Sequence, residues 1–404
     1  MHQDGQCSLC GLNSLNSMVE YGKNPVSNRF SKSKEGAMDV DSIYDISLGY
    51  CAECNHIQLT NKIPINAIRP RYSWITYSEP EDHLDNVTTK LFKSKFITEK
   101  SKILGSTYKD NSLLERFSSL NANNTKEIND QDLSIFNLPT YGIETIVEQL
   151  SKRDIVNNIK NKYGLFDLIV TRHTVEHAID ARKFLLNLSQ LLNDNGRMLI
   201  EIPDNKYLFE SGNHAFVWEE HISYFTEDSM RTLCKIIGAK VILFSRYKYL
   251  YEDSLVVLIE FDKSIGPLTF NNFELTSDKI LSRFSESLQS EKIKWHSRID
   301  RYKRNNLTVA VFGANHLAVR FINYFKLADV IDYVIDDNHN KSGCFMPGSN
   351  IPIISSIDMF QKDINICIST LSPDSEKIVL KKMKIFIDNG GRFIKAFKPK
   401  VISQ

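Results

Sequence analysis

Two pairs of cysteines near the N-terminus constrain this sequence most strongly. Cys7 and Cys10 form one C-x2-C pair, and Cys51 and Cys54 form a second. A zinc ion takes four thiolate or imidazole ligands at tetrahedral corners, and a C-x2-C turn supplies two of them from one short segment. The two pairs therefore predict one structural zinc site. The long segment 11–50 between them favours a small, loop-rich module that the metal holds against a larger part of the protein.

The alternative interpretation of the cysteine pairs is a redox C-x-x-C motif or a set of unrelated free thiols. A redox pair normally lies where a strand meets a helix of a thioredoxin-like unit. The opening segment of this chain lacks that pattern. Structural zinc is therefore the favoured interpretation.

Length and charge limit the classes of protein that this chain can belong to. Its 404 residues predict two or three domains, and its formal net charge of +1 lacks the basic footprint of a nucleic-acid or membrane-surface binder. The apolar run Leu255–Ile259 is too short to span a bilayer, and no apolar stretch follows Met1 as in a signal peptide. Cys234, Cys344 and Cys367 are scattered singly, as in a reducing compartment. We expect a cytoplasmic protein with no nucleic-acid or membrane partner.

Strand and helix patterns alternate along most of the chain after about residue 100. Residues 166–170 and 198–203 predict buried strands, and residues 181–192 between them predict an amphipathic helix. A second alternating unit begins with a strand at 309–314 and continues with another at 364–369. This order predicts an α/β fold with parallel sheets. Ligands of such sheets bind beyond the carboxyl ends of the strands.

Five short motifs occur in one order along the chain and together carry a family resemblance. After the cysteine pairs come R-H-x-x-E-H at 172–177, E-x-P at 201–203 and E-H-x-x-Y-F at 220–225. The segment 336–353 then contains D-x-x-x-x-K-x-G, P-G and I-P-I. In this combination the sequence resembles the zinc-containing sugar C-methyltransferases over nearly its whole length. These enzymes move a methyl group from S-adenosylmethionine (SAM) to a carbon of a nucleotide-linked keto-sugar.

The resemblance implies a domain order and a set of ligands. It implies a zinc-binding module at 1–75, a class I methyltransferase-like doubly wound sheet at 76–265, a helical connector at 266–305 and a C-terminal Rossmann-like substrate-binding domain at 306–404. The cofactors would be SAM and a structural zinc ion. The partner would be a small-molecule, nucleotide-linked sugar, and the protein would be a monomer or homodimer.

The resemblance also places the catalytic histidine in the segment 220–225. Methylation at carbon requires removal of a proton next to a carbonyl group, for which a positioned histidine is suited. His221 is the candidate base, with Glu220 as its orienter or charge partner, and His173 is placed near the floor of the active site. The alternative for His221 is a structural histidine that caps the following helix. We expect His177 to have a packing or capping role.

The chain departs from the family pattern at two places. Family members commonly carry a tyrosine where this chain has Trp218, and an indole can only donate a hydrogen bond, so we assign it a packing role. The family's glycine-rich cofactor turn is matched only with two extra residues and with Asn111 in place of the second glycine. An acidic residue that would hold the ribose has no clear counterpart, and Glu127 and Asp130 are candidates.

The predicted binding residues form two groups. The predicted cofactor-binding residues are Gly105, Ser106, Asp110, Arg172 and His173. The predicted substrate-binding residues are Tyr72, Tyr77, Tyr224, Gly313, Asp336 and Lys341.

Two other functions compete with C-methylation. The same scaffold without SAM would serve an enolising reaction such as epimerisation or elimination, or would only bind a sugar nucleotide. The altered loop at 105–111 is the feature that separates this alternative from the first. A zinc-knuckle nucleic-acid binder is disfavoured by the neutral charge and by the lack of an Arg/Lys stripe.

Overall fold

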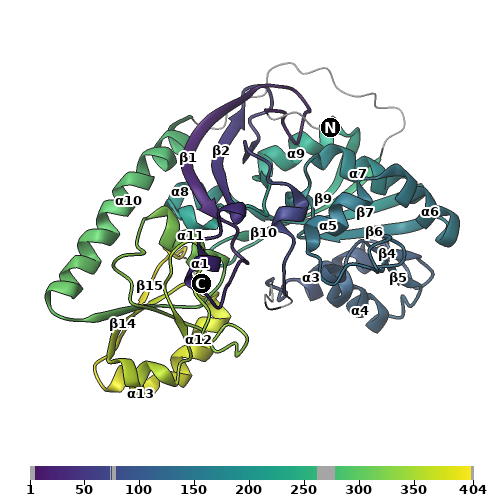
Figure 1. Ribbon diagram of the computed structural model, residues 1–404. Coiled ribbons are helices and arrows are strands. Elements are labelled where there is room, and N and C mark those ends of the chain that lie inside the picture. The colour runs from purple at the N-terminus through teal and green to yellow at the C-terminus, as the bar shows by residue number, and fades with distance from the viewer. Residues whose placement is uncertain (1–4, 73, 75–78, 262–277, 402–404) are drawn as a thin grey trace.

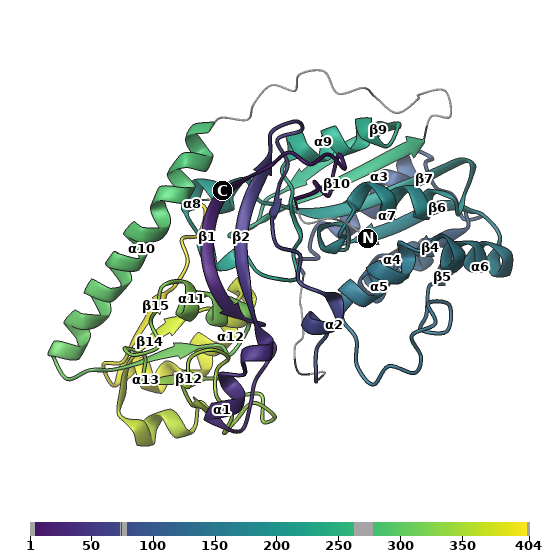
Figure 2. The same ribbon diagram turned by 45° about the horizontal axis from the view of Figure 1, so that its top comes forward.

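The computed structural model describes residues 5–72, 74, 79–261 and 278–401. Within these residues the strands form a six-stranded, a five-stranded and a four-stranded sheet. Figure 1 shows the six-stranded sheet in teal at the right and the five-stranded sheet at the lower left. The purple β1–β2 hairpin of the four-stranded sheet lies between them in this view and in the turned view of Figure 2. β1 is Leu15–Pro25 and β2 is Ile43–Cys51.

The six-stranded sheet has the order β5-β4-β6-β7-β10-β9. Its first four strands are parallel, whereas β10 runs antiparallel to both of its neighbours. In chain order the strands are β4 (Ile103–Gly105), β5 (Thr125–Glu127), β6 (Phe166–Arg172), β7 (Leu192–Asp204), β9 (Ala239–Tyr247) and β10 (Asp253–Phe261).

Helices cover both faces of this sheet because its strands are buried on both sides. Along β6, Leu168 and Val170 join one core with α3 and α4, whereas Ile169 between them joins another with α5, α6, α7 and α9. This alternation is the two-residue period of a strand. The helices are α3 (Leu84–Lys93), α4 (Asn111–Ser119), α5 (Ile143–Leu150), α6 (Arg153–Tyr163), α7 (Ala181–Ser189) and α9 (Glu227–Ile236).

The five-stranded sheet is parallel throughout and has the order β13-β12-β11-β14-β15. The strand order changes direction at β11, and in open α/β sheets the ligand crevice lies at such a point, beyond the carboxyl ends. The strands are β11 (Thr308–Phe312), β12 (Tyr333–Ile335), β13 (Ile353–Ile354), β14 (Ile364–Ser369) and β15 (Arg392–Lys395). Its helices are α11 (His316–Tyr324), α12 (Pro373–Lys382) and α13 (Lys384–Asp388).

A long helix, α10 (Asp278–Arg304), precedes the five-stranded sheet and supplies the predicted helical connector. It runs beside β1 in both ribbon views. The hydroxyl of Ser285 on α10 donates to the backbone oxygen of Met18 on β1 at 2.8 Å. The connector is therefore packed against the hairpin rather than extended into solvent.

The N-terminal module is a sheet rather than the loop-rich segment that we predicted. β1 and β2 form a long antiparallel hairpin, and β3 (Ile57–Leu59) and β8 (Ser223–Tyr224) extend it. β8 comes from the segment that carries the candidate base, so this sheet is not built from the N-terminal residues alone. The short helices α1 (Lys34–Ala37), α2 (Ile65–Ile68) and α8 (Lys206–Ser211) complete the fold.

The three sheets confirm the predicted fold class. The chain is α/β, and in sequence order it has an N-terminal cysteine module, a doubly wound sheet and a C-terminal Rossmann-like unit. The exact domain boundaries stay a prediction, because the hairpin residues Val19 and Tyr21 share one hydrophobic core with the five-stranded sheet. In the described part of the chain, no helix combines the length and apolar character that crossing a membrane requires.

A buried ion pair joins the N-terminal hairpin and the C-terminal unit to the segment before β8. Glu219 and Arg320 are both 0% exposed, and the Glu219 carboxylate lies 2.5 Å from the Arg320 guanidinium on α11. The same carboxylate accepts from the backbone N–H of Ser27, just after β1, at 2.5 Å. Arg320 also donates to the backbone oxygen of Pro25 at 2.7 Å. Each charge is compensated by a group from another part of the chain.

Replacing only one of the two charged residues should destabilise the protein strongly. Glu219→Gln or Arg320→Met leaves one buried charge uncompensated, which costs about 3–5 kcal/mol. The double variant should lose less than the sum of the two single losses, because neither charge is then left buried. The measurement is unfolding in denaturant, with Lys377→Met in the exposed pair with Asp374 as control. Additive losses in the double variant would contradict this account.

Candidate functional site

The four predicted zinc ligands converge on one point. The sulfur atoms of Cys7 and Cys54 lie 3.6 Å apart, as do those of Cys10 and Cys51. All four sulfur atoms lie within 4.8 Å of one another, and each residue is at most 3% exposed. Tetrahedral zinc with Zn–S bonds of about 2.3 Å holds its sulfur ligands roughly 3.8 Å apart. The cluster therefore fits one structural zinc ion.

The two knuckles have the same local geometry. The residue after each pair turns the chain back with a left-handed backbone, at Gly11 with φ 78° and at Asn55 with φ 58°. The N–H of Gly11 donates to the oxygen of Cys7 at 3.0 Å, and the N–H of Asn55 donates to the oxygen of Cys51 at 2.9 Å. Glycine and asparagine tolerate this conformation best, which explains their place in the sequence.

The zinc knuckles pack directly against the segment that contains the candidate base. The hydroxyl of Ser8, between Cys7 and Cys10, lies 2.9 Å from that of Ser223. β3, which follows the second knuckle, pairs Ile57 with Tyr224 of β8. Zinc therefore fixes the position of the chain on the C-terminal side of His221, and its influence extends beyond the first 75 residues.

Two histidines face each other at the candidate catalytic centre. The rings of His177 and His221 lie 4.7 Å apart at an interplanar angle of 85°. Nδ1 of His177 is 2.8 Å from a carboxylate oxygen of the buried Glu144 on α5. The packing or capping role that we predicted for His177 stays a prediction, and the structure adds that its ring packs against the candidate base. The sequence showed only its spacing from His173.

The five-stranded sheet contributes a third histidine near this centre. His316, in the first turn of α11, stacks on Trp218 with ring centroids 4.1 Å apart. The Trp218 ring lies 4.9 Å from that of His221, which agrees with the packing role that we predicted for the indole. Burial lowers the pKa of His316 to about 4. No local motif marks His316, because only the fold brings it beside Trp218.

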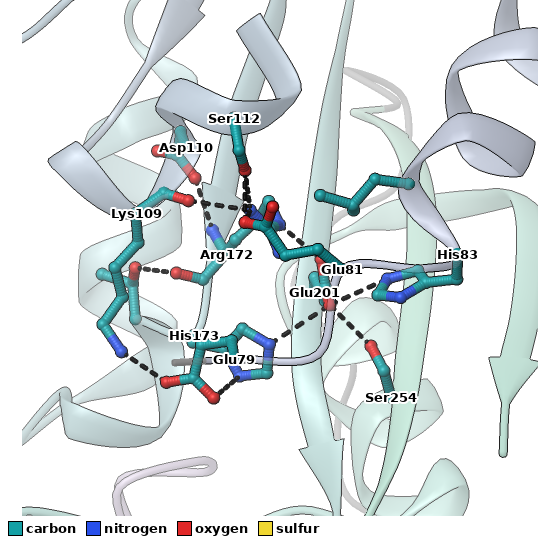
Figure 3. Close-up of polar contacts among 12 residues, drawn as sticks. Glu79, Glu81, His83, Lys109, Asp110, Ser112, Arg172, His173, Glu201 and Ser254 are labelled. Carbon is teal, nitrogen blue, oxygen red and sulfur yellow. Dashed lines mark hydrogen bonds and ion pairs between the residues drawn. The ribbon is translucent and has the colours of Figure 1, made fainter. Parts of the chain in front are cut away.

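A network of buried charges, drawn in Figure 3, surrounds Glu201 at the carboxyl end of β7. The Glu201 carboxylate lies 2.5 Å from the Arg172 guanidinium, 3.2 Å from His173 and 2.9 Å from His83, and it accepts from Ser254 at 2.8 Å. Burial alone would raise the pKa of Glu201, but the hydrogen bonds from the two histidines hold it well below its usual range. The guanidinium of Arg172, a predicted cofactor-binding residue, is thus engaged in an ion pair with Glu201.

The network keeps His173 charged. Burial alone would lower the pKa of His173, but the carboxylates of Glu79, Glu176 and Glu201 outweigh that effect and raise it to about 10. A protonated imidazole cannot accept a proton, so His173 does not fit the role of general base. Both of its ring nitrogens have carboxylate neighbours, and its predicted contact with the cofactor stays a prediction.

The predicted cofactor loop is held together by Asp110. This fully buried carboxylate accepts from the hydroxyl of Ser106 at 3.0 Å and from the N–H groups of Thr107 and Arg172 at 2.9 Å. A Cβ atom added to Gly105 would lie 2.9 Å from Leu114 of α4. The structure therefore gives Gly105 a role in helix packing, rather than the close approach to the cofactor that we expected.

A pocket of about 430 Å³ opens beyond the carboxyl ends of β4 and β5. Glu127 is the last residue of β5, opposite Gly105 of β4, and it lines the pocket. Asp130, the other candidate, accepts a hydrogen bond from the hydroxyl of Tyr141. The lining residues are Tyr108, Glu127, Ile128, Asn129, Asp130, Gln131, Leu133, Tyr141 and Ile146.

Three of the predicted substrate-binding residues meet in the C-terminal unit. Gly313 follows β11 with φ 103°, and Asp336 follows β12. The Asp336 carboxylate accepts from the N–H of Ala314 at 2.8 Å and lies 3.3 Å from Nζ of Lys341, which donates to the oxygen of Ala314 at 2.8 Å. The cluster lies at the carboxyl ends of adjacent strands, where Rossmann-like sheets bind ligands.

The three tyrosines among the predicted substrate-binding residues lie outside this cluster. Tyr224 is fully buried, and its hydroxyl is engaged by the backbone N–H and oxygen of Trp218 at 2.8 and 3.2 Å. The structure therefore contradicts a substrate contact for Tyr224, which instead holds the segment before His221. Tyr72 is 45% exposed and stacks on Trp74, and Tyr77 lies outside the described residues.

Three family models match successive parts of the chain. A zinc binding domain matches residues 7–68, a methyltransferase domain matches 120–243, and a C-methyltransferase C-terminal domain matches 271–397. The order of these three matches is consistent with a zinc-containing C-methyltransferase. The C-methyltransferase NovU of Streptomyces niveus is 22% identical to it over 284 residues. That alignment covers 65% of this chain and 64% of NovU, just under two thirds of the relative's length.

Two solved structures show similarity to part of the chain. One is the 1,6-didemethyltoxoflavin-N1-methyltransferase of Burkholderia thailandensis, at 11% identity and a TM-score of 0.31, covering 45% of this chain and 80% of that chain. The other is a SAM-dependent methyltransferase of Anabaena variabilis, at 10% identity and a TM-score of 0.30, covering 45% of this chain and 86% of that chain.

Loss of the zinc site should loosen two distant parts of the chain together. Cys54→Ser should abolish stoichiometric zinc binding in elemental analysis, because three thiolates leave the tetrahedral site incomplete. Amide hydrogen exchange should then accelerate at residues 57–59 and 222–225, which pair with each other. Cys344→Ser, at a buried thiol outside the cluster, is the control. Full zinc content in Cys54→Ser, or unchanged exchange at 222–225, would overturn this link.

Proposed function

We propose that the protein transfers a methyl group from SAM to a carbon next to the keto group of a nucleotide-linked sugar. The domain composition supports C-methylation, and one structural observation carries the mechanism. His221 and His177 face each other where the cysteine module, the six-stranded sheet and α11 of the C-terminal unit come together. The pocket beyond β4 and β5 is at the edge of the same six-stranded sheet.

The pocket beyond β4 and β5 fits the nucleoside part of SAM. Its volume of about 430 Å³ lies within the range of small-molecule sites, roughly 300–1,000 Å³. The carboxylate of Glu127 is suited to accept hydrogen bonds from ribose hydroxyls, and the Tyr108 ring lines the same pocket. When bound, SAM supplies an electrophilic methyl group. The loop from Gly105 to Asp110 is fixed beside this pocket by its contacts with α4 and β6.

His221 is the residue that we assign as base. Burial first, and then the neighbouring His177 and Lys109, hold its pKa well below the ordinary value, so its imidazole is neutral near pH 7. A neutral imidazole accepts a proton from the carbon next to a keto group, and the resulting enolate is the nucleophile. His177, whose Nδ1 lies beside the Glu144 carboxylate, packs edge-on against the His221 ring with ring centroids 4.7 Å apart.

The C-terminal unit is the proposed site for the nucleotide part of the substrate. Gly313, Asp336 and Lys341 lie together at the carboxyl ends of β11 and β12. The next turn of the chain begins α11, whose His316 stacks on Trp218 beside His221. A ligand that reaches from the Asp336–Lys341 cluster to His221 would place a sugar at the candidate base when its nucleotide lies at the cluster. This arrangement supports a nucleotide-linked sugar over a smaller substrate.

One observation favours the alternative of a reaction without SAM. The loop at 105–111 is closed by Asp110 and by packing against Leu114, in place of an open glycine-rich turn. In that case His221 would serve an enolising reaction such as epimerisation. The presence of a pocket with an acidic residue at the end of β5 argues for SAM, and binding measurements separate the two functions.

Removing the Glu127 carboxylate should weaken SAM binding. A hydrogen bond to a charged group contributes about 1.5–3 kcal/mol, so Glu127→Gln should raise the dissociation constant by roughly ten- to a hundredfold. Calorimetric titration measures this change, with Glu115→Gln on the exposed side of α4 as the matched control. Equal affinity in Glu127→Gln and in the parent protein would show that Glu127 does not hold the ribose.

Replacing the candidate base should reduce turnover without reducing cofactor affinity. His221→Asn removes the proton acceptor and should lower turnover by about two to four orders of magnitude. Trp218→Phe should cost much less, because the ring packs between His221 and His316 and carries no proton in this mechanism. The assay is methyl transfer from labelled SAM, with SAM affinity measured in parallel. Near-normal turnover in His221→Asn would refute the assignment.

A further inference from the structure

A second group of potential metal ligands lies at the candidate catalytic centre. Glu176, His177 and His221 each offer one ligand atom, and these atoms lie within 4.8 Å of one another. One carboxylate and two imidazoles form a donor set that binds zinc and leaves a position open. This group shares no residue with the four-cysteine cluster.

The carboxylate of Glu176 has a free ligand position. Glu176 is 1% exposed, and within the described part of the chain its Oε2 atom has no hydrogen-bond partner. Its other oxygen, Oε1, lies 3.6 Å from Nδ1 of His173. A buried carboxylate oxygen without a partner is costly, and a cation would offset that cost.

His177 has a carboxylate neighbour of the kind that supports a zinc-ligating histidine. Its Nδ1 atom lies 2.8 Å from the Glu144 carboxylate, as an ion pair without the geometry of a hydrogen bond. Histidine ligands usually donate their second N–H to a carboxylate or carbonyl group, and a small rotation of the ring would complete that contact and leave Nε2 for a metal. The chain therefore contains the supporting carboxylate as well as the ligands themselves.

We propose that Glu176, His177 and His221 bind one divalent transition-metal ion of the Zn²⁺ or Co²⁺ class, and that this ion inhibits the enzyme. Metal bonds of about 2.0–2.1 Å hold neighbouring ligand atoms roughly 3.3 Å apart, so the side chains close in by up to ~1.5 Å. His221 lies in a loop and is only partly buried, which leaves room for this movement. Metal binding is independent of the proposed function, whereas inhibition rests on it.

Inhibition follows because the same nitrogen lone pair of His221 would bind the metal and accept the substrate proton. An imidazole nitrogen bound to a metal cannot accept a proton from a substrate carbon. The ion would also occupy the space between His177 and His221, whose rings are 4.7 Å apart. The site would make C-methylation sensitive to free zinc, while the zinc ion held by the cysteines remains in place.

The test is a titration of the full-length, zinc-loaded protein with Co²⁺. We expect one further equivalent to bind, with the weak visible absorption of Co²⁺ in nitrogen and oxygen coordination and without intense sulfur-to-cobalt bands. His177→Ala should abolish this absorption, Glu176→Gln should weaken binding at least tenfold, and Glu144→Gln should weaken it by about 10–100-fold. His339→Ala, which removes an exposed histidine, should bind as the parent protein does.

Two results would overturn the site. One is the absence of any Co²⁺ uptake beyond the cysteine cluster, and the other is an unchanged spectrum in His177→Ala. Added Zn²⁺ should lower turnover, and a mild chelator should restore it. Turnover that rises with Zn²⁺ would overturn the inhibition but not the site. A protein that binds Co²⁺ as expected but transfers no methyl group would refute the proposed function and keep the site.

Discussion

The buried contact between Glu219 and Arg320 is the constraint on which the candidate site depends. Glu219 lies two residues before His221, and its carboxylate is held by a guanidinium from α11 and by Ser27, just after β1 of the hairpin. A buried carboxylate with these partners has little freedom to move, because each lost contact leaves a desolvated charge. The backbone before His221 is thereby tied to the N-terminal module and to the C-terminal unit at once.

The zinc cluster fixes the same segment from its other end. Ser8 of the first knuckle contacts Ser223, and β3 after the second knuckle pairs with β8. Among its described residues the module shows no separate core, since its cysteines pack with the six-stranded sheet and its hairpin packs with the five-stranded sheet. A segment held at Glu219 and again at Ser223 positions His221 between two fixed points. This explains how a metal that is remote from the chemistry can affect it.

Sequence patterns predicted the parts of this protein that depend on local order. The strand at 364–369 and the helix that begins at residue 181 follow from periodicity, and the cysteine ligands follow from spacing. Residues that depend on long-range contacts were not predictable. The sequence could not decide between Glu127 and Asp130, because Glu127 ends a strand of three polar residues without an apolar period, and His177 meets His221 only because the fold brings two loops together. Gly105 matched a cofactor motif, although its neighbour is Leu114.

The central claim is that this fold still binds the methyl donor despite its altered loop. The most direct measurement is calorimetric titration of the zinc-loaded protein with S-adenosylhomocysteine, which has the same nucleoside and amino-acid groups as SAM without the transferable methyl group. The account predicts saturable binding of one molecule per chain. No heat of binding up to millimolar S-adenosylhomocysteine, in protein with full zinc content, would contradict it.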